Sequence, residues 1–260
     1  MTFEHLRPTT AIPPHPNVPG LALTWAPAAG AASFWAAFDQ QVLPTLREAH
    51  QAGLVSAVLP YEHRAVSVAG HGAATWTIAV VVVGKRGRSL GELTQALQAR
   101  ADALSAHGAL RSADMLTMQP NLDVLAQGRP RLQWLEYVVS KPATRELYYT
   151  QQYTFSGPAM RRLSERHGCQ RFVGFEVTER RFTAPGVAAW DVLHISGFGL
   201  WQTLAMLPRF HAAAQAQAAV TFREGVSARD VLRAWNQMRT KTMVRARQQG
   251  ARTLEFTGFD

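Results

Sequence analysis

The sequence predicts an α+β protein built from two copies of one βαββαβ unit. A β-rich hairpin occurs in each half of the chain, with a tryptophan, Trp76 or Trp190, at the equivalent position. In each half this hairpin follows a segment with apolar residues at helical spacing that ends near a glycine. The chain has 260 residues, of which 47% are apolar, so it can bury one large core or two smaller ones.

The elements of the first copy follow from local patterns. Pro27 closes a short apolar strand, and Gly53 stands where a helix C-cap belongs. Ser89 is placed to cap a second helix that ends at Gly108. The expected elements are a strand at 21–26, a helix at 31–52, a hairpin of strands at 54–66 and 75–83, a helix at 89–108 and a strand at 109–118.

The second copy repeats this order, which is the ferredoxin-like plan. Ser227 and Asp230 have capping-box spacing and open its last helix. An apolar, Ala-rich segment at 198–223 is read as an insertion, in which Pro208 is expected to kink or split any helix. The expected elements are strands at 132–140, 170–182, 188–196 and 251–256, and helices at 144–167 and 227–250. The predicted domains are an N-terminal arm at 1–19, repeat 1 at 20–125 and repeat 2 at 126–260.

Composition excludes several classes of protein. The single cysteine, Cys169, has no partner for a disulfide or a cysteine zinc site, which favours a reducing compartment. The first twenty residues lack the apolar core of a signal peptide, and no apolar run is long enough for a membrane span, so we expect a cytoplasmic protein without a membrane partner. The net charge of +9 comes from scattered arginines, with no run of five basic residues, so we expect no nucleic-acid partner.

The two hairpins differ in their polar residues. When they are aligned on the two tryptophans, Val80 corresponds to His194 and Val82 to Ser196. This asymmetry indicates where to look for chemistry. The chain contains no P-loop, no nucleophile elbow and no H-x-x-x-H spacing, and we predict no metal site.

A helix with aromatic residues, a proline and then a glycine precedes the first hairpin: Phe34, Trp35, Phe38, Pro44 and Gly53. This pattern, with a looser echo in the second half, resembles the dimeric α/β-barrel superfamily, particularly its EthD-like and antibiotic-monooxygenase-like branches. The resemblance implies that the antiparallel sheets of two ferredoxin-like repeats pack into one α/β barrel around a ligand cavity.

The chain departs from the EthD-like pattern at one position. EthD-like sequences often carry a histidine before the helix proline, whereas Leu43 precedes Pro44 here and Gly157 precedes Pro158. Their catalytic histidine is therefore not carried over. Chlorite-dismutase-like haem proteins also contain two such units, but this chain shows no proximal-histidine signature.

Strand alternation places Trp190, His194 and Ser196 on one face of the second hairpin, predicted to line the cavity, and leaves the opposite face to pack under helices. His194 is the expected general acid or base, and Glu176 would fix its tautomer. The predicted catalytic residues are His194, Tyr61 as an oxyanion donor, and Glu176. The predicted substrate-binding residues are Arg180 as an anion clamp, His63, Trp190, Ser196, Trp201 and Phe210. Purely structural roles remain open for each of them.

These residues favour a cofactor-independent enzyme that performs proton-transfer chemistry of the lyase, cyclase or oxygenase type. Its substrate would be a hydrophobic, aromatic and anionic small molecule. One alternative is a haem-binding barrel protein with His194 or His211 as the axial ligand. Another is a small-ligand-binding protein without catalysis, and the sequence leaves a homodimer open.

Overall fold

The computed structural model describes residues 3–70, 75–125, 130–165 and 169–256, and it confirms the predicted α+β class. Its strands are β1 (Pro19–Pro27), β2 (Val55–Val68), β3 (Ile78–Gly84), β4 (Gly108–Leu125), β5 (Leu132–Ser140), β6 (Arg171–Thr183), β7 (Val192–Phe198) and β8 (Arg239–Gln248). These eight strands follow the hydrogen-bonded order β1-β3-β2-β8-β5-β7-β6-β4, which closes a barrel. The pairs with a described register, such as β2 with β3 and β5 with β7, are antiparallel.

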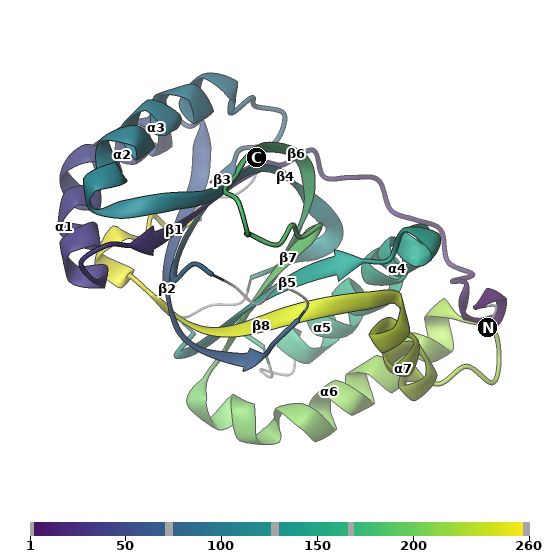
Figure 1. Ribbon diagram of the computed structural model, residues 1–260. Helices are drawn as coiled ribbons and strands as arrows, with labels where there is room; N and C mark the ends of the chain where they lie inside the picture. The colour runs from purple at the N-terminus through teal and green to yellow at the C-terminus, as the bar shows by residue number, and fades with distance from the viewer. Residues whose placement is uncertain (1–2, 71–74, 126–129, 166–168, 257–260) are drawn as a thin grey trace. The chain divides into compact units, whose positions relative to one another are not determined.

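The helices alternate with the strands so that each half of the chain follows the predicted βαββαβ order (Figure 1). They are α1 (Ala31–Gln41), α2 (Leu43–Gln51), α3 (Gly91–Ala103), α4 (Arg145–Gln151), α5 (Gly157–Glu165), α6 (Leu200–Thr221) and α7 (Ala228–Met238). A π-helical turn, Gln152–Ser156, joins α4 to α5. None of the described helices is both long and apolar enough to span a membrane.

The chain forms two compact units. The α1–α3 unit comprises Asn17–Thr117, Val177–Ala189 and Val244–Asp260. The α4–α7 unit comprises Met1–Pro16, Met118–Glu176 and Trp190–Met243. Each unit therefore has its own helices and its own core.

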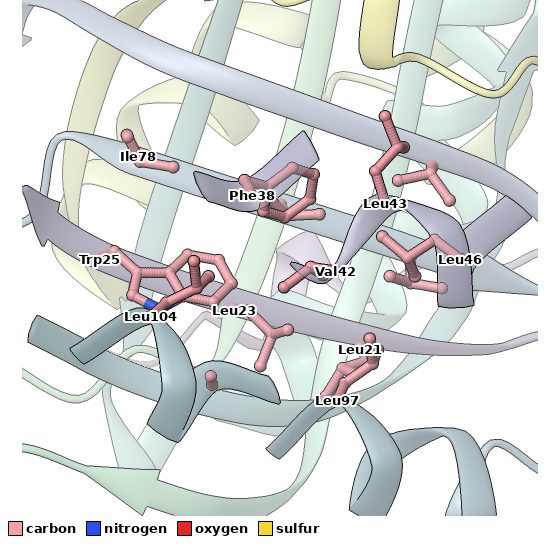
Figure 2. Close-up of a cluster of buried hydrophobic side chains, with 14 of the residues drawn as sticks. Leu21, Leu23, Trp25, Phe38, Val42, Leu43, Leu46, Ile78, Leu97 and Leu104 are labelled. Atoms are coloured by element: carbon pink, nitrogen blue, oxygen red, sulfur yellow. The ribbon is translucent and has the colours of Figure 1, made fainter. Parts of the chain in front are cut away.

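The core of the α1–α3 unit is an apolar layer between its helices and strands (Figure 2). Phe38 of α1 is fully buried, with its ring 6.5 Å from that of Trp25 on β1 and 5.4 Å from that of Trp35. Edge-on packing of this kind is a favourable arrangement of aromatic rings. Val80 of β3 belongs to the same buried cluster.

The predicted first helix is two helices. Val42 separates α1 from α2, and Pro44 lies in the first turn of α2. A proline lacks the N–H that would continue the α1 ladder, but it is well suited to the start of a new helix.

The predicted helix at 227–250 was wrong beyond Met238. The capping box of Ser227 and Asp230 is present and opens α7, but strand β8 begins at Arg239. In β8 the buried positions alternate, at Thr242, Val244 and Ala246, which is the period of a half-buried strand. The capping box marks the start of the helix, and the change from helical to alternating periodicity after Met238 marks its end.

Two further expectations at the C-terminal side of the chain need correction. The residues predicted as a last strand form a short 3₁₀ turn, Gly250–Arg252, and a single β-bridge between Leu254 and Val58. Residues 198–223 contain one helix, α6, which runs through Pro208 without a break. The alanine-rich sequence after Pro208 has high helix propensity, which offsets the hydrogen bond that the proline removes.

We expect Phe38→Ala to lower the free energy of unfolding by about 4 kcal/mol, because it removes a fully buried ring and leaves a cavity. Equilibrium urea denaturation measures this change. Val66→Ala is the control, since Val66 is 48% exposed and its truncation should change stability by less than about 0.5 kcal/mol. Similar effects of the two substitutions would contradict the assigned core.

Candidate functional site

The α4–α7 unit contains a cavity of about 450 Å³ between strands β5 to β8 and the helices that cover them. Figure 1 shows α5, α6 and α7 along one side of β5 and β8. The wall is mostly apolar, and its polar groups are concentrated on the strands. The lining residues are Trp134, Glu136, Gln152, Ser156, Met160, Leu163, Phe172, His194, Ser196, Phe198, Phe210, Leu232, Trp235, Asn236, Arg239, Lys241 and Met243.

His194 lies at the centre of the polar part of the cavity. It is 1% exposed and stands directly across from Glu136 of β5 and from Gly174 of β6 in the strand registers. Its Nδ1 is 3.3 Å from Glu136 Oε2, and its Nε2 is 3.2 Å from Gln119 Oε1. A Cβ at position 174 would lie 2.7 Å from Gln119 Oε1, so a glycine there leaves room for the Gln119 side chain.

The two partners of His194 are both hydrogen-bond acceptors. Gln119 donates from Nε2 to Glu176 at 3.3 Å, which turns its carbonyl oxygen toward His194. His194 therefore faces a carbonyl oxygen on one side and the Glu136 carboxylate on the other. Since both are acceptors, both bonds form together only when the two ring nitrogens carry hydrogen. A neutral imidazole, with one N–H, can donate to only one of these two oxygens.

Glu136 also binds two cations from β8. Its Oε1 is 3.1 Å from Arg239 Nη1 and 3.3 Å from Lys241 Nζ. Burial by itself would raise the pKa of this carboxyl, but the charges of Arg239, His194 and Lys241 together hold it well below its ordinary value. The Arg239 guanidinium is 8% exposed, lies over the rings of Trp235 and Tyr148, and donates to the Tyr148 hydroxyl.

Lys241 marks the solvent side of the cavity, because its side chain is 31% exposed whereas that of Arg239 is almost covered. Arg239 and Lys241 give two positive charges against the single carboxylate of Glu136. The polar wall of the cavity therefore carries excess positive charge, which favours an anionic ligand.

Glu176 reaches His194 only through Gln119. The carboxylate accepts hydrogen bonds from the Tyr153 hydroxyl and from Gln119 Nε2. Burial, and then the neighbouring Glu176 charge, raise the pKa of Tyr153, which keeps this hydroxyl protonated as a donor. Tyr153, Glu176, Gln119, His194 and Glu136 thus form one chain of hydrogen bonds from β6 across to β5.

Other predicted site residues are also in this unit. Ser196 and Phe210 line the cavity with His194. Trp190 is 2% exposed and packs its ring edge against that of Tyr137, 5.5 Å away. Trp201 is on α6, but its side chain lies outside the described residues.

Tyr61, His63 and Arg180 belong to the α1–α3 unit. Tyr61 is fully buried on β2. His63 Nδ1 donates to the carbonyl of Trp76, and burial lowers the pKa of its ring to about 4. Arg180 is paired with Asp114 of β4 across 3.6 Å.

The predicted face of β7 lines a cavity, but not on the expected side of the sheet. Val192, in line with His194 and Ser196, packs in a cluster with Trp235 and Met238, so this is the helix-covered face. The sequence predicts that the opposite face packs under helices, because Leu193 and Ile195 are apolar. Both faces of β7 are largely buried, so an apolar residue can lie on either face. Apolar character therefore does not show which face the helices cover.

Sequence reasoning missed Glu136, Arg239, Lys241, Gln119 and Gln152. A charged residue inside the apolar strand at 132–140 was a signal for Glu136. Arg239 and Lys241 are two residues apart and share one face of strand β8. Because a helix is predicted over these residues, the sequence does not place them on a common face. Nothing in the local sequence indicates the two glutamines.

Among the described lining residues, His194 is the histidine that could ligate a haem iron. Its Nδ1 is held by Glu136, and its Nε2 would have to leave Gln119. His211 is exposed on α6 and is not part of the wall. Burial raises the pKa of the Cys169 thiol to about 12, so it is not a thiolate ligand at neutral pH. Within the described part of the chain, no group of three acidic, histidine or cysteine side chains is placed to hold a metal ion.

Solved structures share this fold over almost the whole chain. A candidate monooxygenase from Lactobacillus acidophilus NCFM aligns with a TM-score of 0.53 at 8% identity, covering 93% of this chain and 97% of its own. A candidate monooxygenase from Fusobacterium nucleatum gives 0.53 at 9% identity, with 93% and 94% covered. A heme-binding protein from Thermus thermophilus gives 0.49 at 9% identity, with 92% and 94% covered.

No protein-family model and no curated protein matches the sequence. At these identities the likeness to solved structures shows the fold alone. The chemistry must therefore be argued from the cavity itself.

We expect Glu136→Gln to lower the free energy of unfolding by about 3 kcal/mol at neutral pH, because it leaves the buried Arg239 without its counter-charge. Urea denaturation measures the loss. Asp123→Asn is the control: Asp123 pairs with Arg161 at the surface, and its removal should cost less than about 1 kcal/mol. The Glu136 carboxyl has a depressed pKa, so the difference from wild type should shrink as pH falls below about 4.5. A constant difference down to strongly acidic pH would contradict the assigned pairing.

Asp114 should give the opposite pH dependence. Burial raises the pKa of its carboxyl to about 6 despite Arg180 and Ser112, so folding favours the protonated form. Wild-type stability should therefore fall, relative to Asp114→Asn, by about 2 kcal/mol as pH rises from about 4 to about 6. Paired urea titrations across this range measure the difference. If the two proteins kept parallel pH profiles, Asp114 would titrate normally in the folded state.

Proposed function

We propose that the cavity of the α4–α7 unit is the active site of a cofactor-independent enzyme that acts on a hydrophobic, aromatic, anionic small molecule by proton transfer. One observation carries this proposal: a buried histidine, held by a carboxylate, lies beside two cations in the wall of an otherwise apolar cavity. The apolar wall suits a ring system, and Lys241 at the mouth suits its anionic group.

His194 is the proton-transfer group of this proposal. Its bond to the Glu136 carboxylate is charge-assisted, whereas its bond to the neutral Gln119 amide is weaker. A ligand group can therefore replace Gln119 at Nε2, while Glu136 holds the ring through Nδ1. With Nε2 unprotonated, the ring takes a proton from an acidic C–H bond of the substrate, which leaves an enolate. The imidazolium so formed then returns a proton, or a deuteron after exchange with solvent, to the same carbon.

The two cations support the same chemistry. Lys241 and Arg239 hold the substrate anion, and negative charge that develops next to it is stabilised in a largely water-excluded site. Proton transfer of this kind is common to lyases, cyclases and cofactor-independent oxygenases. The ferredoxin-like order of both halves supports placing the chain, as a tandem form, beside the EthD-like and antibiotic-monooxygenase-like barrels.

We expect the protein to accelerate deuterium incorporation at the benzylic carbon of phenylpyruvate or indolepyruvate in D₂O, followed by proton NMR. Both are aromatic anions with an acidic C–H bond. His194→Gln should lower the protein-dependent rate by about 100-fold or more, which is the usual contribution of a general acid or base. Its effect on the dissociation constant should be much smaller, because Lys241 and the apolar wall remain.

His211→Gln is the matched control, because His211 is an exposed histidine outside the cavity wall, and its exchange rate should equal that of wild type. Unchanged exchange in His194→Gln would refute the role of His194. Tight binding of both anions with exchange at the uncatalysed rate would instead support a ligand-binding protein without catalysis.

A further inference from the structure

Gln152 is a buried amide that faces the cavity without a protein partner. It is 1% exposed, and it lines the cavity at the first residue of the π-helical turn between α4 and α5. Among the described residues, neither its Oε1 nor its Nε2 has a hydrogen-bond partner. Buried polar groups are nearly always hydrogen-bonded, so an amide with both ends unsatisfied indicates a missing partner.

The preceding residue shows how the fold treats a structural amide. Gln151 donates from Nε2 to the carbonyl of Leu6 at 2.9 Å and accepts at Oε1 from Trp235 Nε1 at 2.6 Å. The amide of Gln151 is therefore hydrogen-bonded at both ends within the core, whereas that of Gln152 faces the cavity without a partner. An unsatisfied amide is thus not a general feature of buried glutamines in this part of the chain.

The π-helical turn explains how both side chains are accommodated. Such a turn inserts an extra residue into a helix, changes the direction of the side chains and is frequent at functional sites. Asn121 donates to the carbonyl of Tyr153 inside the turn at 2.9 Å, and Thr154 donates back to the carbonyl of Thr150. The turn is therefore fixed by side-chain hydrogen bonds, and it holds Gln152 toward the strands that carry His194 and Arg239.

We propose that Gln152 recognises a neighbouring N–H and C=O pair on the ligand, as in a lactam ring, so that the substrate class is an aromatic lactam carboxylate. This inference rests on the proposed function, because the carboxylate is the group assigned to Lys241 and Arg239. A glutamine amide presents one donor and one acceptor in a single plane, and a cis-amide of a ring presents the complementary pair. The cavity of about 450 Å³ has room for such a bicyclic ring.

The test compares ligands of equal shape by calorimetric titration. The probes are 2-quinolone carboxylates with the carboxylate at ring position 4 or 6, and the matching naphthoates, which lack the lactam. We expect at least one quinolone carboxylate to bind about tenfold more tightly than its naphthoate, the effect of satisfying a buried amide. In Gln152→Met this preference should disappear, while naphthoate affinity stays at the wild-type value.

Lys241→Met is the matched control, because it removes a cavity charge and leaves the amide; it should weaken both probes by the same factor and keep their ratio. Naphthoate binding without any lactam preference would overturn the role of Gln152 and leave the anion site intact. Failure of both probes to bind, in a protein that is folded by circular dichroism, would overturn the proposed function and this inference with it. A preference that persists in Gln152→Met would assign lactam recognition elsewhere.

Discussion

The α4–α7 unit depends on the compensation of one buried charge, the carboxylate of Glu136. An ionised carboxylate is costly to remove from water unless cations and hydrogen bonds replace its hydration. His194 supplies one partner from the adjacent strand β7, and Arg239 and Lys241 supply two from β8. Three strands must therefore keep their register for the charge to be neutralised. The same requirement places a histidine, two cationic side chains and a carboxylate around one cavity.

The comparison of the two units shows what this cluster does to packing. In the α1–α3 unit the helix-covered face of β3 carries Val80 and Val82, which pack into a continuous apolar cluster with Phe38. In the α4–α7 unit the aligned residues of β7 are His194 and Ser196, and a cavity lies between them and the helices. The α1–α3 unit thus has a packed apolar layer at the position where the α4–α7 unit has a cavity. The duplication that would explain the correspondence stays a prediction.

Fold and chemistry are decided at different levels in this protein. The barrel topology is shared with solved structures at 8% and 9% identity, so it can be kept while almost every side chain changes. Such a fold carries many reactions, and its cavity residues determine which one it performs. Here the cavity histidine is held at Nδ1 by Glu136 and faces Gln119 at Nε2.

Local sequence patterns determined the class, the βαββαβ order, the strand at 132–140 and the capping box of Ser227, because periodicity and caps act over a few residues. They also singled out His194 and Ser196. Tertiary structure alone decided that Glu136, rather than Glu176, contacts His194, and that Arg239 and Lys241 of β8 compensate Glu136. Strand register and the order of strands in a sheet bring together residues far apart in the chain, and no short pattern records that pairing. Tertiary structure also decided which face of β7 the helices cover, because both faces are largely buried and solvent exposure does not distinguish them.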